Sequence, residues 1–190
     1  MTSSASFVDR VRHLGVQLRG AFGPTLVYAW QDVGDGETST IEGLAFSGNL
    51  VLGHMVSEEL ALGMDLVLAR SGNVSYGVLD STAFTAVHLG AGVTYWLMPA
   101  NVYFAASLGA ARTSVETQRI QLGEALPDNE SSDLGLGMHL SIGKLWWLDK
   151  RWGLGASLSL LASTASNPIG DRSSQRNLVA PTLALSATFH

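Results

Sequence analysis

Residues 60–70 read Leu-Ala-Leu-Gly-Met-Asp-Leu-Val-Leu-Ala-Arg, and every second residue from Leu60 to Leu68 is large and apolar. The residues between them are mostly small or polar, with Ala61, Gly63, Asp65 and Ala69 on the second parity. Because successive side chains of a β-strand point to opposite faces, this alternation predicts a strand with one apolar face.

The same alternation occurs eight times, which predicts an all-β protein of eight antiparallel strands joined as four hairpins. The expected strands cover approximately residues 13–30, 42–53, 60–70, 82–97, 102–112, 134–146, 152–160 and 179–189. The expected fold is an up-and-down transmembrane β-barrel over residues 13–190, preceded by a periplasmic tail at residues 1–12. The first ten residues lack the pattern of a secretory signal, so an exported protein would be a mature form with an added Met1.

The expected connections alternate between short and long. Short periplasmic turns and long extracellular loops are typical of outer-membrane barrels, and this order places both termini in the periplasm. The expected tight turns are Val56–Glu59, Met98–Asn101 and Asp149–Arg151. The expected long polar loops are Gln31–Ile41, Ser71–Ser81, Thr113–Asp133 and Ser163–Asn177.

Composition excludes several other classes of protein. Charged residues make up 14% of the chain, against about 25% in an ordinary soluble domain. No apolar run reaches the roughly 18 residues that a membrane-spanning helix needs. The net charge is −5 and the only lysines are Lys144 and Lys150, so no basic face for nucleic acid is expected. The chain has no Cys, which rules out disulfides and thiolate metal sites.

The distribution of charges and aromatic rings indicates which parity faces lipid. Only Arg19 and Asp65 are charged residues well inside the expected strands, and both lie on the face opposite the large apolar side chains. Aromatic side chains collect at both ends of the strands, where membrane barrels carry aromatic girdles. The expected interfacial aromatics are Tyr28 and Trp30 at one rim, and Tyr95, Trp96, Tyr103, Trp146, Trp147 and Trp152 at the other.

Three segments resemble small outer-membrane barrel proteins of the OmpA/OmpX-like family. Residues 92–109 and 143–155 look like periplasmic hairpins of that family, and Leu183–Phe189 resembles its C-terminal strand. The resemblance implies a Gram-negative outer membrane, contact with its lipid and lipopolysaccharide, and recognition of Phe189 by the insertion machinery. The family usually ends on the aromatic residue, whereas His190 follows Phe189 here.

The polar residues of the lumen parity are the candidate functional group. Arg19 and Asp65 lie at similar heights two strands apart, and a buried ion pair between them is the favoured interpretation over a gate. His88 and His139 also point inward, but no third ligand accompanies them, so we expect hydrogen-bonding residues and no metal site.

The triplet His139-Leu-Ser141 resembles the spacing of the catalytic pair in lipid A deacylases. In those enzymes the pair lies on the outer wall, whereas the parity here turns His139 and Ser141 into the lumen. No carboxylate is placed to orient a base. We therefore expect no catalytic residue, no cofactor and no enzyme activity.

The expected loops contain the remaining charged side chains. Acidic loops could hold cations or a surface partner, but solvated loop composition explains them equally well. These residues are Glu116, Glu124, Asp128, Glu130 and Asp133 in one loop, and Arg172 and Arg176 in another.

The leading functional hypothesis is a barrel with a largely closed lumen that displays its loops in a structural, adhesive or protective role. The alternatives are a narrow channel or transporter for small or hydrophobic solutes and, less favoured, a lipid-modifying enzyme. A soluble lipocalin-like barrel would need a polar exterior and an apolar interior, the reverse of this pattern.

Overall fold

The computed structural model describes residues 15–34, 37–76, 79–121, 124–149, 151–169 and 172–189. The predicted N-terminal tail, residues 1–12, and His190 lie outside these ranges. In the described ranges no helix is long and apolar enough to cross a membrane.

The described chain is almost entirely strand, with one short 3-10 helix, η1, at Met98–Ala100. The strands are β1 (Val16–Gly34), β2 (Glu37–Met55), β3 (Leu60–Tyr76), β4 (Leu79–Leu97), β5 (Val102–Gln121), β6 (Glu124–Ser131), β7 (Gly135–Trp147), β8 (Trp152–Ile169) and β9 (Arg172–Phe189).

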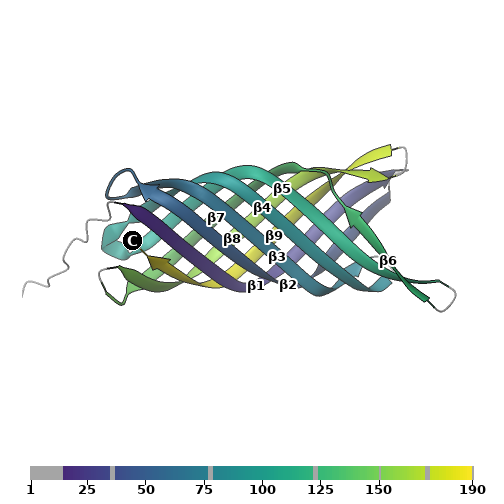
Figure 1. Cartoon of the computed structure of the whole chain (residues 1–190), viewed down its shortest axis with the longest axis horizontal. Coiled ribbons are helices and arrows are strands. Elements are labelled where there is room, and N and C mark those ends of the chain that lie inside the picture. The colour runs from purple at the N-terminus through teal and green to yellow at the C-terminus, as the bar shows by residue number, and fades with distance from the viewer. Residues whose placement is uncertain are drawn as a thin grey trace, which may run out of the picture.

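These strands close into a barrel in which all pairings are antiparallel (Figure 1). Eight strands form the wall in the order β1-β2-β3-β4-β5-β7-β8-β9, and β9 pairs with β1 to complete the ring. The ninth strand, β6, pairs with the outer part of β5, where Ser114 lies opposite Ser131 and Gln121 lies opposite Glu124. The predicted eight-stranded up-and-down barrel is confirmed.

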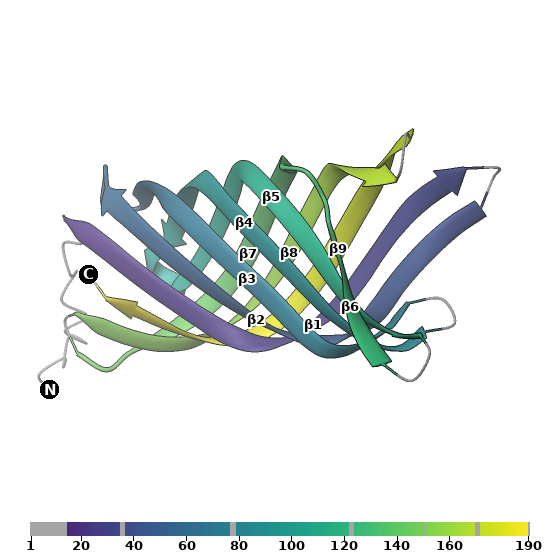
Figure 2. The ribbon, with the colours of Figure 1, turned by 45° about the vertical axis from the view of Figure 1, so that its right-hand side comes forward.

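The three tight turns lie where the sequence predicts them, between β2 and β3, β4 and β5, and β7 and β8. The strands are longer than the ranges expected from the sequence. The strands continue through most of each polar stretch and form hairpins that project beyond the barrel (Figure 2). For example, Gln31 pairs with Ser39 and Asp32 with Thr38. Pairing continues outward from the barrel, with register shifts between Glu42 and Phe46 and between Ser71 and Val74, and Thr suits an extended backbone there.

The outer wall is apolar over the middle of every strand. Along β3, Leu62, Met64, Leu66 and Leu68 are 42–56% exposed, whereas the alternate residues face the interior. On this outer face the apolar band of β3 ends at Arg70 and that of β5 ends at Arg112, both exposed. The residues that the sequence assigns to the apolar face of β3 therefore lie on the outside of the wall, and the residues between them lie on the inside.

The residues of the predicted aromatic girdles divide between the outer wall and the interior of the barrel. Tyr28, Tyr95, Trp146 and Trp152 are exposed on the outer wall near its two edges. Trp30 and Trp147 are half-buried.

Trp96 and Tyr103 were expected among the interfacial aromatics, although the alternation also turns Tyr103 inward. The interfacial assignment is wrong for both, because each is only 1% exposed and lies inside the barrel. Their rings pack against each other with centroids 5.2 Å apart. Both have the lumen parity of their strands, so their position in the pleat decides their orientation.

Candidate functional site

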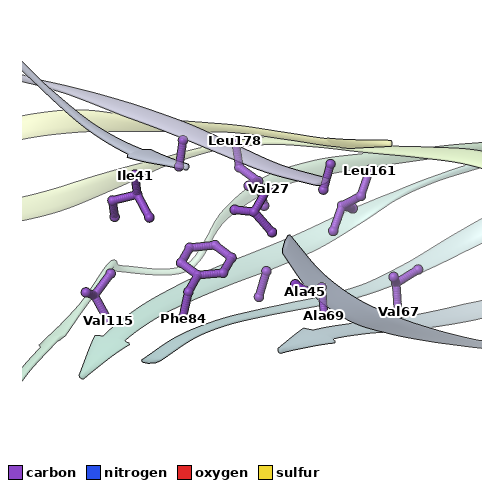
Figure 3. Packing of buried hydrophobic residues seen from close by; sticks show 12 residues of the cluster. Val27, Ile41, Ala45, Val67, Ala69, Phe84, Val115, Leu161 and Leu178 are labelled. Carbon is purple, nitrogen blue, oxygen red and sulfur yellow. The ribbon is translucent and has the colours of Figure 1, made fainter. Parts of the chain in front are cut away.

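The lumen of the barrel contains two apolar clusters with polar side chains between them. The hairpin-side plug fills the lumen toward the long hairpins, and Figure 3 shows Phe84 and Val27 pointing toward one another within it. Its members are Val27, Ala29, Ile41, Ala45, Val67, Ala69, Phe84, Ala86, Val115, Leu161, Leu178 and Ala180. The turn-side plug lies toward the tight turns and consists of Met55, Ala61, Trp96, Tyr103 and Leu145.

The polar side chains between the plugs form what we call the polar layer, and all of them point into the lumen. Its members are Gln17, Arg19, Asn49, Asp65, His88, Ser107 and His139, which come from β1, β2, β3, β4, β5 and β7. The layer thus gathers the four predicted lumen residues and adds three that the sequence did not single out.

Asp65 is the centre of the polar layer. His139 Nδ1 donates to Asp65 Oδ2 at 2.6 Å, and Ser107 Oγ donates to the same oxygen at 2.8 Å. Asn49 Nδ2 donates to Asp65 Oδ1. Three donors from three other strands therefore hold this buried carboxylate, as a buried charge requires.

His88 extends the same network. The Nε2 atom of His88 lies 3.1 Å from Ser107 Oγ. Because the Ser107 hydroxyl donates its proton to Asp65, its oxygen accepts the hydrogen bond from His88 Nε2. Within the described residues no three His, Asp or Glu side chains lie close enough to hold a metal ion. The two histidines act as hydrogen-bonding groups in the lumen.

Arg19 lies at the height expected for it, but its partner differs from the prediction. Arg19 is opposite Val51 on β2, and Val51 is opposite Asp65 on β3, so the two charged residues share one row of the sheet. The ion pair within 4.0 Å that Asp65 makes is with His139. Arg19 instead places its guanidinium carbon 4.0 Å from the centre of the Tyr103 ring. The predicted Arg19–Asp65 contact is wrong, because His139 and Ser107 reach the carboxylate across the lumen.

Glycines on the inner face make room for the large lumen side chains. A Cβ at Gly143 would lie 2.5 Å from Cε1 of Tyr103, and one at Gly137 would lie 2.5 Å from Nδ1 of His88. Because real Cβ atoms do not approach that closely, these positions accept Tyr103 and His88 only as glycines.

The space left in the polar layer is small. One cavity of about 10 Å³ touches Gln17, Arg19 and Asp65, and a second of about 10 Å³ touches Tyr103 and His139. A volume of this size holds about one water molecule. The two apolar plugs and the polar layer thus occupy the described part of the lumen at three levels.

His139 and Ser141 occupy positions on the inner side of β7. His139 is 3% exposed and its Nδ1 donates to Asp65, so the expectation that no carboxylate lies beside this histidine is wrong. Ser141 lines the second lumen cavity. Their neighbours Met138, Leu140 and Ile142 face outward. The arrangement keeps the hydroxyl away from the wall, where a lipid acyl chain would lie.

The bases of the hairpins are held by arginines. Arg176 was expected among solvated loop residues, but it is 2% exposed and its Nε donates to Gln31 Oε1 at 2.9 Å, so this prediction is wrong. Arg112 donates to Ser132 O and to Ser131 Oγ.

Only some of the other expected loop charges are described. Glu116 and Asp133 are exposed. The side chains of Glu124, Asp128, Glu130 and Arg172 lie outside the described part of the chain.

Phe189 ends the last wall strand. It lies opposite Leu18 of β1 and Trp152 of β8, and its ring centroid is 5.1 Å from that of Trp152. The expected recognition of Phe189 during insertion stays a prediction.

Sequence reasoning missed Asn49, Ser107 and Gln17 as members of the polar layer. Each has the lumen parity of its strand, and Ser107 lies in the register that brings it opposite His139. Parity alone could have placed all three in the lumen. Asn49 reaches Asp65 from the neighbouring strand β2, whereas Ser107 reaches it from β5, 42 residues away in the sequence.

The sequence matches no protein-family model and no curated protein. The structure, in contrast, is similar to several solved structures. Ail, the attachment invasion locus protein of Yersinia pestis, matches with a TM-score of 0.53 and 14% identity, over 93% of this chain and 99% of Ail.

Two other solved structures match in the same way. Neisserial surface protein A has a TM-score of 0.54 and 14% identity, over 92% of this chain and 96% of its own. The outer membrane protein OprG from Pseudomonas aeruginosa has a TM-score of 0.52 and 14% identity, over 95% and 99% of the two chains. The chain therefore has the fold of the small eight-stranded outer-membrane β-barrel proteins.

Proposed function

We propose that this protein is an integral, non-enzymatic barrel of a Gram-negative outer membrane that acts at the cell surface through its projecting hairpins. In this proposal the lumen stays closed and both termini lie in the periplasm. The role of the hairpins is structural, adhesive or protective.

The outer wall supports the membrane part of the proposal. Its apolar side chains would be costly to expose to water, and on β3 they run from Leu62 to Leu68 before Arg70 ends the band. Tyr95, Trp146 and Trp152 lie at the turn-side edge and Tyr28 at the other. This distribution matches a hydrocarbon layer between two interfaces.

The observation that carries the proposal is the length of the hairpins. β5 continues past the end of the apolar band at Arg112 to Gln121 and pairs there with β6. A membrane crossing uses only about 9–11 residues of each strand, whereas β1, β2 and β4 each have 19 residues. The turns at the other end are tight. The described segments that extend beyond the apolar band therefore lie mainly at the hairpin end of the barrel.

Closure of the lumen favours this role over a channel. Eight strands enclose an interior that side chains can fill, and here two apolar plugs and the polar layer fill it. Two of the structural neighbours are named for attachment and invasion and as a surface protein. Those names support a surface role for a barrel of this size.

The absence of enzyme activity is part of the proposal. Ser141 and His139 point into a lumen whose cavities are too small for a lipid acyl chain. Acyl release from lipopolysaccharide by the purified barrel would contradict it.

The hairpins can be tested separately from the barrel. Each of the four hairpins is shortened to a two-residue turn at the edge of the apolar band, in cells of a Gram-negative strain that displays the protein. Heat-modifiable gel migration checks folding. Attachment to matrix-coated surfaces and survival in serum are then measured.

We expect at least one shortened hairpin to abolish the cell-surface phenotype while folding is unchanged. A matched variant, Phe84→Ala, opens the hairpin-side plug and leaves the hairpins intact, so it should keep the phenotype. If all four shortened proteins behave like the unmodified one and Phe84→Ala changes solute uptake, the channel alternative replaces this proposal.

A further inference from the structure

The cavity beside Arg19 has the properties of a binding site for one small anion. Arg19 is 1% exposed and Gln17 is 0% exposed, and both line this cavity of about 10 Å³. We propose that the cavity binds a single monatomic anion of the halide class, chloride in the physiological case.

The hydrogen-bonding groups at the cavity are the first argument. Arg19 Nε and Nη1 and both side-chain amide atoms of Gln17 are buried and have no hydrogen-bond partner among the described residues. Buried polar groups are nearly always satisfied, so the three nitrogen donors of Arg19 and Gln17 at this cavity call for an acceptor.

Charge is the second argument. Arginine stays protonated, and a buried cation requires compensation. Tyr103 offers its ring face, but no carboxylate oxygen lies within 4.0 Å of the guanidinium among the described residues. Water would accept hydrogen bonds without supplying negative charge. An anion supplies both.

Asp65 also lines the cavity and must be accounted for. Its carboxylate already accepts from Asn49, Ser107 and His139. The 2.6 Å contact with His139 is short, as in a charge-assisted pair. These bonds come from β2, β5 and β7, and Arg19 donates none of them, so Asp65 leaves Nε and Nη1 of Arg19 without an acceptor.

Size selects the class of anion. A volume of about 10 Å³ accepts a particle close to the size of one water molecule. Chloride and bromide are of that order, whereas sulfate, phosphate and carboxylates are too large. The plugs on either side exclude bulk water, so the ion would be held and not conducted.

Bromide tests the site because its anomalous scattering distinguishes it from water. Crystals of the detergent-solubilised protein grown in sodium bromide should show an anomalous peak in contact with Arg19 and Gln17. Ordered water without an anomalous peak would overturn the proposal.

Solution measurements provide an independent test. The thermal midpoint of unfolding should be higher in sodium chloride than in sodium gluconate at equal ionic strength, because an anion bound only to the folded state stabilises it. Gln17→Met removes one donor and keeps the cation, and it should weaken halide binding. Arg19→Lys loses the guanidinium fork and should weaken it by about 10- to 100-fold.

Leu18→Met is the matched control, because Leu18 lies on the same strand and faces outward. It should retain the chloride effect of the unmodified protein. Equal midpoints in chloride and gluconate for the unmodified protein would contradict the proposal even if the Arg19 variants fail to fold.

Discussion

The guanidinium of Arg19 lies against the face of Tyr103, with its central carbon 4.0 Å from the ring centre. Tyr103 in turn packs on Trp96 in the turn-side plug. One aromatic residue thus joins the polar layer to the apolar plug beneath it, and it covers the only buried cation of that layer in the described chain.

Removing this ring should destabilise the barrel. Tyr103→Leu loses the cation–π contact and leaves a cavity, which should cost about 1–3 kcal/mol of folding free energy. Tyr103→Phe keeps the ring and should cost much less. Urea unfolding in lipid vesicles measures both, and equal losses would show that the hydroxyl, not the ring, is the stabilising part.

The choice of partner at Asp65 can be measured by double-mutant cycles. Asp65→Ala leaves three donors unsatisfied and should cost about 3–5 kcal/mol. The cycle with His139→Gln should show a coupling energy of about 1–3 kcal/mol. The corresponding cycle with Arg19→Met should show a clearly smaller value. A larger coupling of Asp65 to Arg19 would restore the direct ion pair predicted from the sequence.

The glycine at position 143 should be intolerant of a methyl group. Gly143→Ala places a Cβ 2.5 Å from the Tyr103 ring, and the resulting overpacking should cost about 1–3 kcal/mol. Gly20→Ala is the control, because the nearest atom to its added Cβ is 4.0 Å away. If the two variants unfold at the same urea concentration, the lumen is less tightly filled than described.

The edge of the lipid-facing band can be located with arginine substitutions on one strand. Met64 is 56% exposed in the middle of the band, and Met64→Arg should cost about 2–4 kcal/mol. Gly72 is on the same face beyond Arg70, with no atom within 4 Å of an added Cβ. Gly72→Arg should therefore be close to neutral. Equal costs in vesicles would mean that the band is misplaced.

The β7–β8 turn should depend on the charge of Asp149. Its Oδ1 accepts from the backbone N–H groups of Arg151 and Trp152, at 2.6 and 2.8 Å, and these bonds lower the pKa of Asp149. Because the pKa is lower in the folded state, the stabilisation is present above the ordinary aspartate range and is lost as the pH falls through the lowered value. Carboxyl chemical shifts followed by NMR in micelles should give a midpoint below about 3.9.

Much of the fold can be predicted from the sequence because the alternation of residues such as Leu62 and Met64 with Gly63 and Asp65 leaves only one face suitable for lipid. The tight turns follow from the same pattern. The extent of the hairpins does not, because segments such as Thr38–Thr40 are polar on both faces and carry no burial signal. Their strand structure comes from pairing across the hairpin, as between Asp32 and Thr38.

The sequence predicts the level along the barrel axis at which the polar layer lies, but not which of its side chains contact one another. Counting residues places Arg19 and Asp65 in one row, as the pairing through Val51 shows. Which side chain reaches the carboxylate depends on the width of the closed barrel, and His139 is 74 residues away from Asp65. Trp96 and His88 are eight residues apart on β4 and so point to the same side of the sheet, which predicts that Trp96 lies inside the barrel. Its place next to a turn favoured the interfacial assignment instead.

The most direct test of the closed-lumen account is electrical recording from the purified barrel in planar bilayers. The unmodified protein should give no steady conductance in potassium chloride, because Tyr103, the Asp65 network and Phe84 close the lumen at three levels. A steady, large conductance from the unmodified protein would contradict the closed lumen and favour transport as its function.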